Sequence, residues 1–182
     1  MKPTFRAAGR ADRHIFLDMW QGYLDDQYEG GSGVPPTEHN LREYLKLYDS
    51  YVTGALHGLC MLAEDEEGEP AGLIFAGEEL PGALNLDTPM GRCITLWGVY
   101  VRPAFRGQHL AWQMQDAAHV IWRDTMNFKT CVSTVLLGYP QAEKNAFEWP
   151  GGEGGVAQKH SVMIVVPLRR EEALDGRFEA NQ

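Results

Sequence analysis

Residues 96–111, LWGVYVRPAFRGQHLA, contain the strongest structural signal in the sequence. This stretch begins inside a nearly continuous apolar run, residues 93–101, of the kind found in a central strand that is buried on both faces. Pro103 closes this strand, and apolar residues then recur at helical spacing from Leu110 to Ile121. The stretch therefore predicts a strand, a short turn and a helix in direct succession, with Asn127 marking the end of the helix.

The turn between this strand and this helix carries groups that can bind an anion. A glycine-bearing turn that opens a helix directly after a strand presents free backbone N–H groups together with the positive end of the helix dipole. Arg106 adds a fixed cation with several donors, and Gly107 lets the backbone approach a phosphate closely. The sequence thus predicts a pyrophosphate site over residues 106–111.

The remaining elements follow from periodicity and turn signals. A short strand over residues 4–8 precedes two helices, one capped by Asp12 and running to about Leu24, the other capped by Thr37 and ending before Gly54. Two apolar runs flanking an acidic turn predict an antiparallel hairpin. The runs are 56–63 and 71–77; further strands are expected over 130–137 and 161–168, a weak helix over 141–147 and a loop over 150–155. This order predicts an α+β (α/β layered) fold, with helices covering a mixed sheet.

Composition narrows the class of protein. At 182 residues and 44% hydrophobic content, the chain fits one globular domain over residues 1–182, with a polar tail from about residue 169. A net charge of −9 argues against nucleic acid as the main partner, because phosphate binding depends on clustered Lys and Arg. The acidic stretch 64–69 is interpreted as a solvated turn; the alternative is a field that attracts a cationic substrate.

Targeting and redox signals are absent from the sequence. No signal-peptide core or membrane-length apolar stretch occurs, so a soluble, cytoplasmic protein without membrane partners is expected. Cys60, Cys93 and Cys131 have neither metal-ligand spacing nor an even count for disulfides, so we expect reduced, mostly buried thiols.

Residues 106–111 resemble the acetyl-coenzyme A loop of the GCN5-related N-acetyltransferases (GNAT). The family pattern is Gln or Arg, two residues, Gly, one residue, then Gly or Ala; Arg106 and Ala111 occupy its outer positions. His109 stands where the central Gly is usual, so its side chain either crowds the pyrophosphate or contributes a hydrogen bond. The opening strand and helix and the acidic hairpin also fit the family, and the resemblance spans about residues 5–168.

The resemblance implies a GNAT, or acyl-CoA N-acyltransferase, fold with a mixed, mostly antiparallel sheet. It implies acetyl-CoA as co-substrate, no metal, and transfer of acetyl to a primary amine of a small molecule or of a protein lysine. Backbone amides of the central strand would position the thioester carbonyl. The residues implied to bind the cofactor are Val99, Tyr100, Val101, Arg106, Gly107, Gln108, His109, Leu110 and Ala111. A homodimer is expected if residues 161–166 offer a pairing edge.

The amine must lose a proton, yet residues 93–101 contain no carboxylate. The candidate bases lie outside this strand, and Glu79 is the one that we assign to the predicted site. They are Glu78, Glu79, Asp87, His57 and His160. The family commonly places a Tyr near the sulfur as acid for the thiolate; Phe147 aligns with that position, which leaves Tyr139 as the substitute.

For several residues, a role in packing or a position at the surface is favoured over a functional role. The aromatic residues Trp97 and Tyr100 are expected in the core rather than in the acceptor pocket. Packing of the first helix is favoured over a substrate gate for Trp20, Tyr23 and Tyr28. His119 is expected to face solvent.

Two other functions remain open at this stage. One is a GNAT-fold binding or structural module without turnover, for which His109 and the missing base and acid are the evidence. The other is an unrelated nucleotide-binding α/β domain, which would need a longer glycine fingerprint than Gly107 provides.

Overall fold

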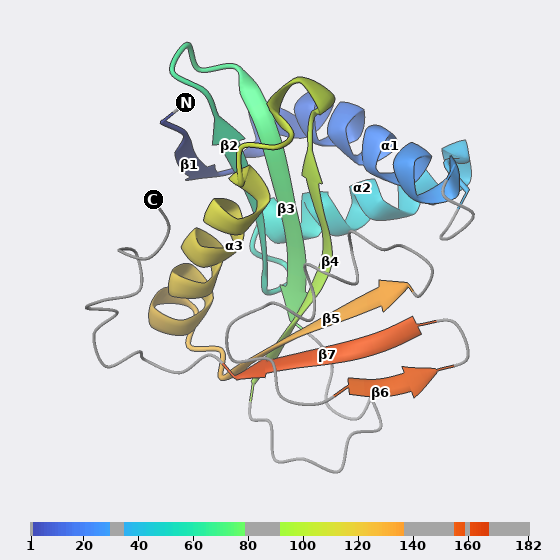
Figure 1. Cartoon of the computed structure of the whole chain (residues 1–182), viewed down its shortest axis with the longest axis vertical. Helices are drawn as coiled ribbons and strands as arrows, with labels where there is room; N and C mark the ends of the chain where they lie inside the picture. The colour runs from blue at the N-terminus through green and yellow to red at the C-terminus, as the bar shows by residue number, and fades with distance from the viewer. Residues whose placement is uncertain (1, 30–34, 79–91, 137–154, 159–160, 168–182) are drawn as a thin grey trace.

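One mixed sheet of seven strands forms the centre of the protein (Figure 1). The computed structural model describes residues 2–29, 35–78, 92–136, 155–158 and 161–167. Neighbouring strands are antiparallel except β4 and β5, which are parallel because a helix connects them. The strand order is β1-β2-β3-β4-β5-β7-β6. The strands are β1 (Thr4–Ala7), β2 (Gly58–Glu64), β3 (Pro70–Glu78), β4 (Cys93–Val101), β5 (Thr130–Leu136), β6 (Gly155–Gln158) and β7 (Ser161–Pro167).

Helices cover both faces of the β1–β4 part of the sheet. Helices α1 (Arg13–Glu29) and α2 (Glu38–Val52) lie on one face, and α3 (Leu110–Val120) lies on the other (Figure 1). Helix α3 continues as a π-helical turn, Ile121–Thr125. This three-layer arrangement confirms the predicted α+β class with a mixed, mostly antiparallel sheet.

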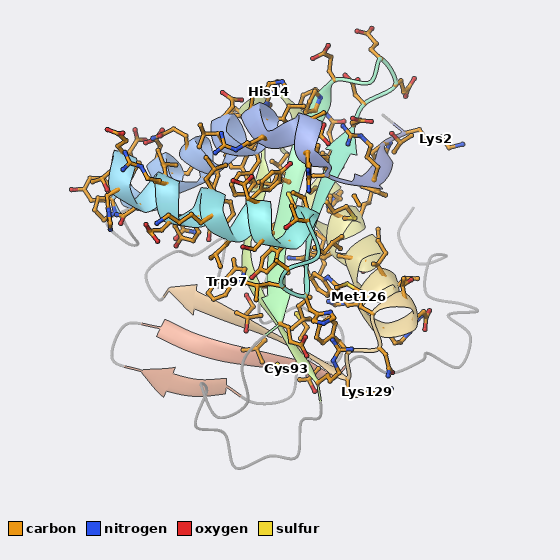
Figure 2. All side chains as sticks on the ribbon, turned by 180° about the vertical axis from the view of Figure 1, so that it is seen from behind. Lys2, His14, Cys93, Trp97, Met126 and Lys129 are labelled. Atoms are coloured by element: carbon orange, nitrogen blue, oxygen red, sulfur yellow. The ribbon has the colours of Figure 1, made fainter. Side chains whose placement is uncertain are left out.

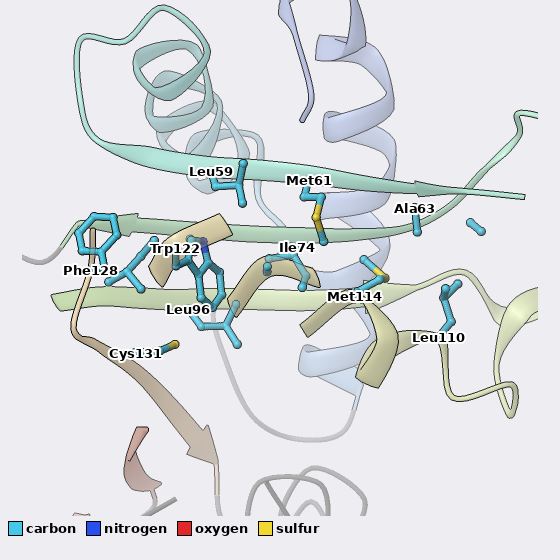
Figure 3. Packing of buried hydrophobic residues seen from close by; sticks show 14 residues of the cluster. Leu59, Met61, Ala63, Ile74, Leu96, Leu110, Met114, Trp122, Phe128 and Cys131 are labelled. Atoms are coloured by element: carbon cyan, nitrogen blue, oxygen red, sulfur yellow. The ribbon is translucent and has the colours of Figure 1, made fainter. Parts of the chain in front are cut away.

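Alternation along the hairpin strands divides the core into two clusters. Met61 and Ile74 face α3, where Met114 and Trp122 complete one cluster (Figure 3). Their strand neighbours face the other way and pack against Phe16, Trp20 and Tyr48 of α1 and α2. Period-2 burial on both faces is why β2 and β3 read as continuous apolar runs in the sequence.

The first helix differs from its prediction at both ends. A 3₁₀ turn, Arg10–Asp12, precedes α1, and the Asp12 carboxylate accepts from the Gly9 N–H at 2.8 Å and pairs with Arg6. Asp12 therefore caps this turn rather than the helix. Helix α1 also runs to Glu29, past the predicted end at Leu24, because polar residues continue it after the apolar spacing stops.

Two further predictions are corrected near the other end of the sheet. Strand β6 begins at Gly155, inside the predicted loop. Strand β7 was expected to offer a pairing edge, but it lies between β5 and β6, so β1 and β6 are the outermost of the described strands. The predicted helix over residues 141–147 lies outside the described residues.

His119 is also placed differently from its prediction. It is half-buried beside Trp122, with ring centroids 5.4 Å apart, rather than facing solvent. All three cysteines are buried thiols outside any disulfide bond, as expected. None of the helices in the described ranges has the length and hydropathy of a transmembrane span.

Candidate active site

Strand β4 changes its surroundings halfway along its length. It pairs with β3 from end to end, but its parallel ladder with β5 covers only residues 93–96. Beyond this point β5 continues beside β7, and Figure 1 shows β4 and β5 diverging. We call residues 93–96 the paired half and residues 97–101 the open half, because no described strand pairs with the β5-facing edge of the open half.

The two halves meet at a β-bulge. Leu96 pairs with Ala76 and Gly98 pairs with Phe75, so Trp97 is an extra residue on β4. Trp97 is 38% exposed, whereas the four residues of the paired half are all buried. The bulge thus stands where the strand leaves its second partner.

Hydrogen-bond alternation shows which backbone groups face the open edge. The Arg102 N–H donates to the Ala71 carbonyl at 3.0 Å, so the same pattern directs Gly98 and Tyr100 toward β3. Val99 and Val101 then direct their groups to the open side. The Val101 carbonyl confirms this direction, since it accepts from Arg106 Nε at 3.0 Å.

The phosphate loop, residues 106–111, follows the open half directly. A 3₁₀ turn, Pro103–Phe105, redirects the chain, and Gly107 and His109 then take left-handed conformations with φ of 78° and 56°. His109 is the N-cap of α3, and its carbonyl accepts from the Gln113 N–H at 3.2 Å. A helix has no internal partner for its first N–H groups, so the α3 N-terminus offers donors and a positive dipole end at this loop.

His109 thus holds a torsion that glycine adopts freely. A left-handed non-glycine residue costs roughly 1–2 kcal/mol, which gives a physical reason why the family pattern usually has Gly there. The loop nevertheless keeps the left-handed path with a histidine side chain, and residues 106–109 are all exposed. The donors of the loop therefore remain accessible to an anion.

Arg106 connects the loop to the first helix. Its Nη2 donates to Asp26 of α1 and its Nε donates to the Val101 carbonyl, while its guanidinium lies 5.7 Å from the centre of the Tyr100 ring. A guanidinium carries five N–H donors, and these two hydrogen bonds use two of them. Arg106 is therefore held at the start of the loop with donors left for phosphate oxygens.

Aromatic side chains of α1 and α2 lie against the face of β3 and β4 that these two helices cover. The Trp97 side chain lies on the face covered by α2 (Figure 2), near Gly77, where an added Cβ would be 3.0 Å from Trp97 Nε1 and would also meet Tyr51. Tyr23 of α1 donates its hydroxyl to the Trp97 carbonyl at 3.1 Å. The structure corrects the expectation that Trp97 is a core residue.

The other aromatic predictions have mixed outcomes. Trp20 is 1% exposed and packs in the core, as favoured from the sequence, whereas Tyr28 is 56% exposed. Tyr100 is half-buried, and burial raises its pKa above the ordinary value.

The described residues do not test the predicted base and acid. Glu79 and Tyr139 lie outside them, as do Asp87 and His160. Glu78 is described: Arg92 donates to its two oxygens at 2.9 and 3.0 Å, and this pairing lowers the pKa of the carboxyl. A carboxylate held in this way is a poor base. His57 is exposed next to β2.

Some features of the site had little signal in the sequence. Asp26, the partner of Arg106, is separated from it by eighty positions, and no spacing rule connects the two. Gly98 inside an apolar strand was a usable signal, since glycine there marks a close approach by another element. Within the described ranges, no group of three or more His, Cys, Asp or Glu side chains is arranged to hold a metal ion.

Comparisons with known proteins agree with this geometry. The family model described as Acetyltransferase (GNAT) family matches residues 17–131, which include β4 and the phosphate loop. A search of curated proteins finds no match.

Solved structures share the fold at low sequence identity. An N-acetyltransferase from Staphylococcus aureus Mu50 is 14% identical with a TM-score of 0.67, covering 93% of this chain and 100% of its own. A spermidine N-acetyltransferase SpeG chimera from Vibrio cholerae and hSSAT is 15% identical with a TM-score of 0.65, covering 92% and 96%.

A third structure contains the co-substrate. The putative acetyltransferase yncA from Salmonella typhimurium, with its cofactor acetyl-CoA, is 14% identical with a TM-score of 0.68 and covers 97% of this chain and 100% of its own. The divergence of β4 and β5, the phosphate loop and the family match lead to one conclusion: the chain belongs to the GNAT acetyltransferase family, which uses acetyl-CoA.

Proposed function

We propose that this protein is an N-acetyltransferase that transfers the acetyl group of acetyl-CoA to a primary amine of a small molecule or of a protein lysine. The observation that carries this proposal is the open half of β4 running directly into the phosphate loop. An elongated ligand with amide groups at one end and a pyrophosphate at the other fits this succession of donors and acceptors.

Different residues bind different parts of acetyl-CoA in this proposal. Arg106 and the N–H groups at the start of α3 hold the pyrophosphate, together with Gly107, Gln108 and His109. Val99 and Val101 offer backbone groups to the pantetheine amides, as a strand edge does to an added strand. The remaining members of the set are Tyr100, Leu110 and Ala111. These residues fit acetyl-CoA because donors meet the phosphates and an open edge meets the amides.

Acetyl-CoA supplies an activated acyl group as a thioester. The amine nitrogen forms a bond to the acetyl carbon, the carbon–sulfur bond breaks, and the sulfur leaves as thiolate. The Val99 N–H, the first backbone donor at the open edge after the bulge, is suited to stabilise the charge that develops on the thioester oxygen. Holding amine and thioester together supplies much of the remaining acceleration.

The proton leaves the amine through Glu79 in this proposal, and Tyr139 protonates the departing thiolate. The second transfer is helpful rather than obligatory, since a thiol of pKa about 8.5 is already a tolerable leaving group at neutral pH. Replacing Glu79 by Gln should lower kcat more than Tyr139→Phe does.

The acceptor is proposed to be a cationic amine. The net charge of −9 favours its approach, and one structural neighbour is a spermidine N-acetyltransferase. A panel of spermidine, tryptamine and a lysine peptide therefore samples small and protein-like acceptors. Release of free thiol from acetyl-CoA, followed with each amine, measures transfer.

The thiol assay separates an enzyme from a binding module. At least one amine should accelerate thiol release above the rate of hydrolysis without amine. Binding of acetyl-CoA without acceleration by any amine in a broad screen would instead support a module that keeps the fold and the cofactor but not turnover.

A further inference from the structure

A single side chain from α1 reaches the bulge of β4. The Tyr23 hydroxyl donates to the carbonyl of Trp97, the extra residue of the bulge, at 3.1 Å. A bulge residue is left out of the regular ladder, so its peptide groups need another partner to stay in one orientation. Tyr23 provides that partner from outside the sheet.

Close packing holds the Tyr23 ring against the bulge. A Cβ added at Gly98 would lie 2.7 Å from Tyr23 Cζ and 2.9 Å from Trp20 Cη2. In return, a Cβ added at Gly22 would lie 2.5 Å from the Tyr100 hydroxyl oxygen. Helix and strand each place a ring over a glycine of the other, so the contact tolerates little sliding.

The Tyr23 ring is also held from behind. It lies 4.6 Å from the Trp20 ring, and Trp20 is 1% exposed in the core cluster of α1 and α2. Burial raises the pKa of Tyr23 well above its ordinary value, so its hydroxyl stays protonated at neutral pH. A hydroxyl in this state donates a hydrogen bond and cannot serve as a base.

We propose that Tyr23 is a positioning residue for acetyl transfer: by holding the Trp97 carbonyl it sets the orientation of the bulge and thereby the place of the Val99 N–H that receives the thioester oxygen. The peptide between Trp97 and Gly98 is planar, so fixing its carbonyl fixes its whole orientation. Val99 follows Gly98, so the Val99 N–H belongs to the next peptide along the strand. This inference rests on the proposed function.

Tyr23→Phe removes the hydroxyl and keeps the ring. Tyr48→Phe is the matched control, because the Tyr48 hydroxyl also donates to a backbone carbonyl, that of Gly9, in the same aromatic cluster but away from β4. Calorimetric titration with acetyl-CoA, thiol release with a reactive amine, and the infrared carbonyl band of bound acetyl-CoA labelled with ¹³C at the thioester carbon form the readouts.

The Tyr23→Phe variant should lower kcat by about tenfold, less than the roughly 10²-fold loss on removing an oxyanion donor itself. Its affinity for acetyl-CoA should stay within about threefold of wild type, since most contacts of the ligand are elsewhere. The carbonyl band of the bound thioester should move toward its position in free solution. Tyr48→Phe should reduce thermal stability yet leave the band and kcat at wild-type values.

The outcomes separate this inference from the function it rests on. No acetyl-CoA binding by wild type would overturn both. Binding and turnover with an unchanged band and kcat in Tyr23→Phe would overturn the positioning role alone. If Tyr23→Phe does not fold, 3-fluorotyrosine at position 23 keeps the ring and strengthens the donor, and its band should shift in the opposite direction; an unshifted band would equally overturn the role.

Discussion

The two halves of β4 have the same kind of sequence and opposite surroundings. In the paired half, residues 93–96 are buried and pair on both sides, with β3 and β5. In the open half, residues 98–101 pair with β3, no described strand pairs with the other edge, Trp97 is exposed, and the Val99 and Val101 backbone groups face that edge. One half of the strand therefore lies between two strands, and the other half has an edge with no described strand beside it.

The difference shows how a protein keeps backbone groups available for a ligand. Unpaired N–H and C=O groups are costly when buried, so they persist beside a site that water or a ligand can reach. The bulge and the contact with α1 hold the open half in place, while no described strand pairs with its other edge. The contacts with β3 and α1 hold the strand in place, and the backbone groups at its open edge are available to a ligand.

Removing apolar volume from each half of β4 should give the largest difference between the two halves. Ile94→Ala should lower the free energy of unfolding by about 2–5 kcal/mol, because Ile94 is fully buried between two strands and under α3. Val99→Ala should cost about 1 kcal/mol, since Val99 is only half-buried. Urea denaturation of both variants measures the difference. Equal losses would mean that the halves do not differ in packing.

The next effect concerns the anion contact of Arg106. Arg106→Ala should weaken acetyl-CoA binding by roughly 10–100-fold, as expected for loss of charge-assisted hydrogen bonds. Arg102→Ala is the control, because Arg102 also pairs with an acid of α1, Asp18, but precedes the phosphate loop. Calorimetry should give the control an affinity within about twofold of wild type. Equal weakening in both variants would point to a general charge effect.

Acid should weaken the packing around His119 on α3. Burial lowers the pKa of His119 from 6.5 to about 4, with the charge of Arg123 adding to the effect. The unfolded chain therefore binds a proton at higher pH than the folded one, so stability is full above pH 6.5 and falls as the pH drops toward 4. His119→Gln should lose less stability over this range in urea titrations at several pH values.

An exposed histidine serves as the control for this titration. His57→Gln is the matched substitution at a histidine outside the core, and it should change the free energy of unfolding little. An identical pH profile for wild type and His119→Gln would show that His119 does not contribute to acid sensitivity.

The smallest effect comes from the left-handed residue in the loop. His109→Gly should raise the free energy of unfolding by about 0.5–1 kcal/mol, the relief of left-handed strain less the extra freedom of glycine in the unfolded chain. Asn127→Gly should gain less, since Asn tolerates its φ of 58°. Thermal denaturation compares the two. Acetyl-CoA affinity should stay within about threefold in His109→Gly; a tenfold loss would show that the imidazole itself binds phosphate.

Local rules predicted the elements and the phosphate loop. Thr37 caps α2 by accepting from the Asn40 N–H, Pro103 follows β4, and the hairpin strands lie where the apolar runs predicted them. Each of these features depends on residues close together in the sequence. The family resemblance over residues 106–111 then located the loop at the start of α3.

Non-local geometry was beyond prediction from the sequence. The apolar run 93–101 gives no sign that β5 leaves β4 after Leu96 or that Trp97 bulges, because both depend on how other strands pair. The contacts of Asp26 with Arg106 and of Tyr23 with Trp97 join positions far apart along the chain. The roles of Glu79 and Tyr139 stay predictions.

Amide hydrogen exchange with and without acetyl-CoA shows whether the co-substrate lies along the open half of β4. Binding along the open half should slow exchange at Val99, Val101 and the first amides of α3, while Ile94 and Leu96, already paired, should keep their rates. Protection confined to other parts of the chain, with the Val99, Val101 and phosphate-loop amides unchanged, would contradict the proposed placement of acetyl-CoA on the open half of β4.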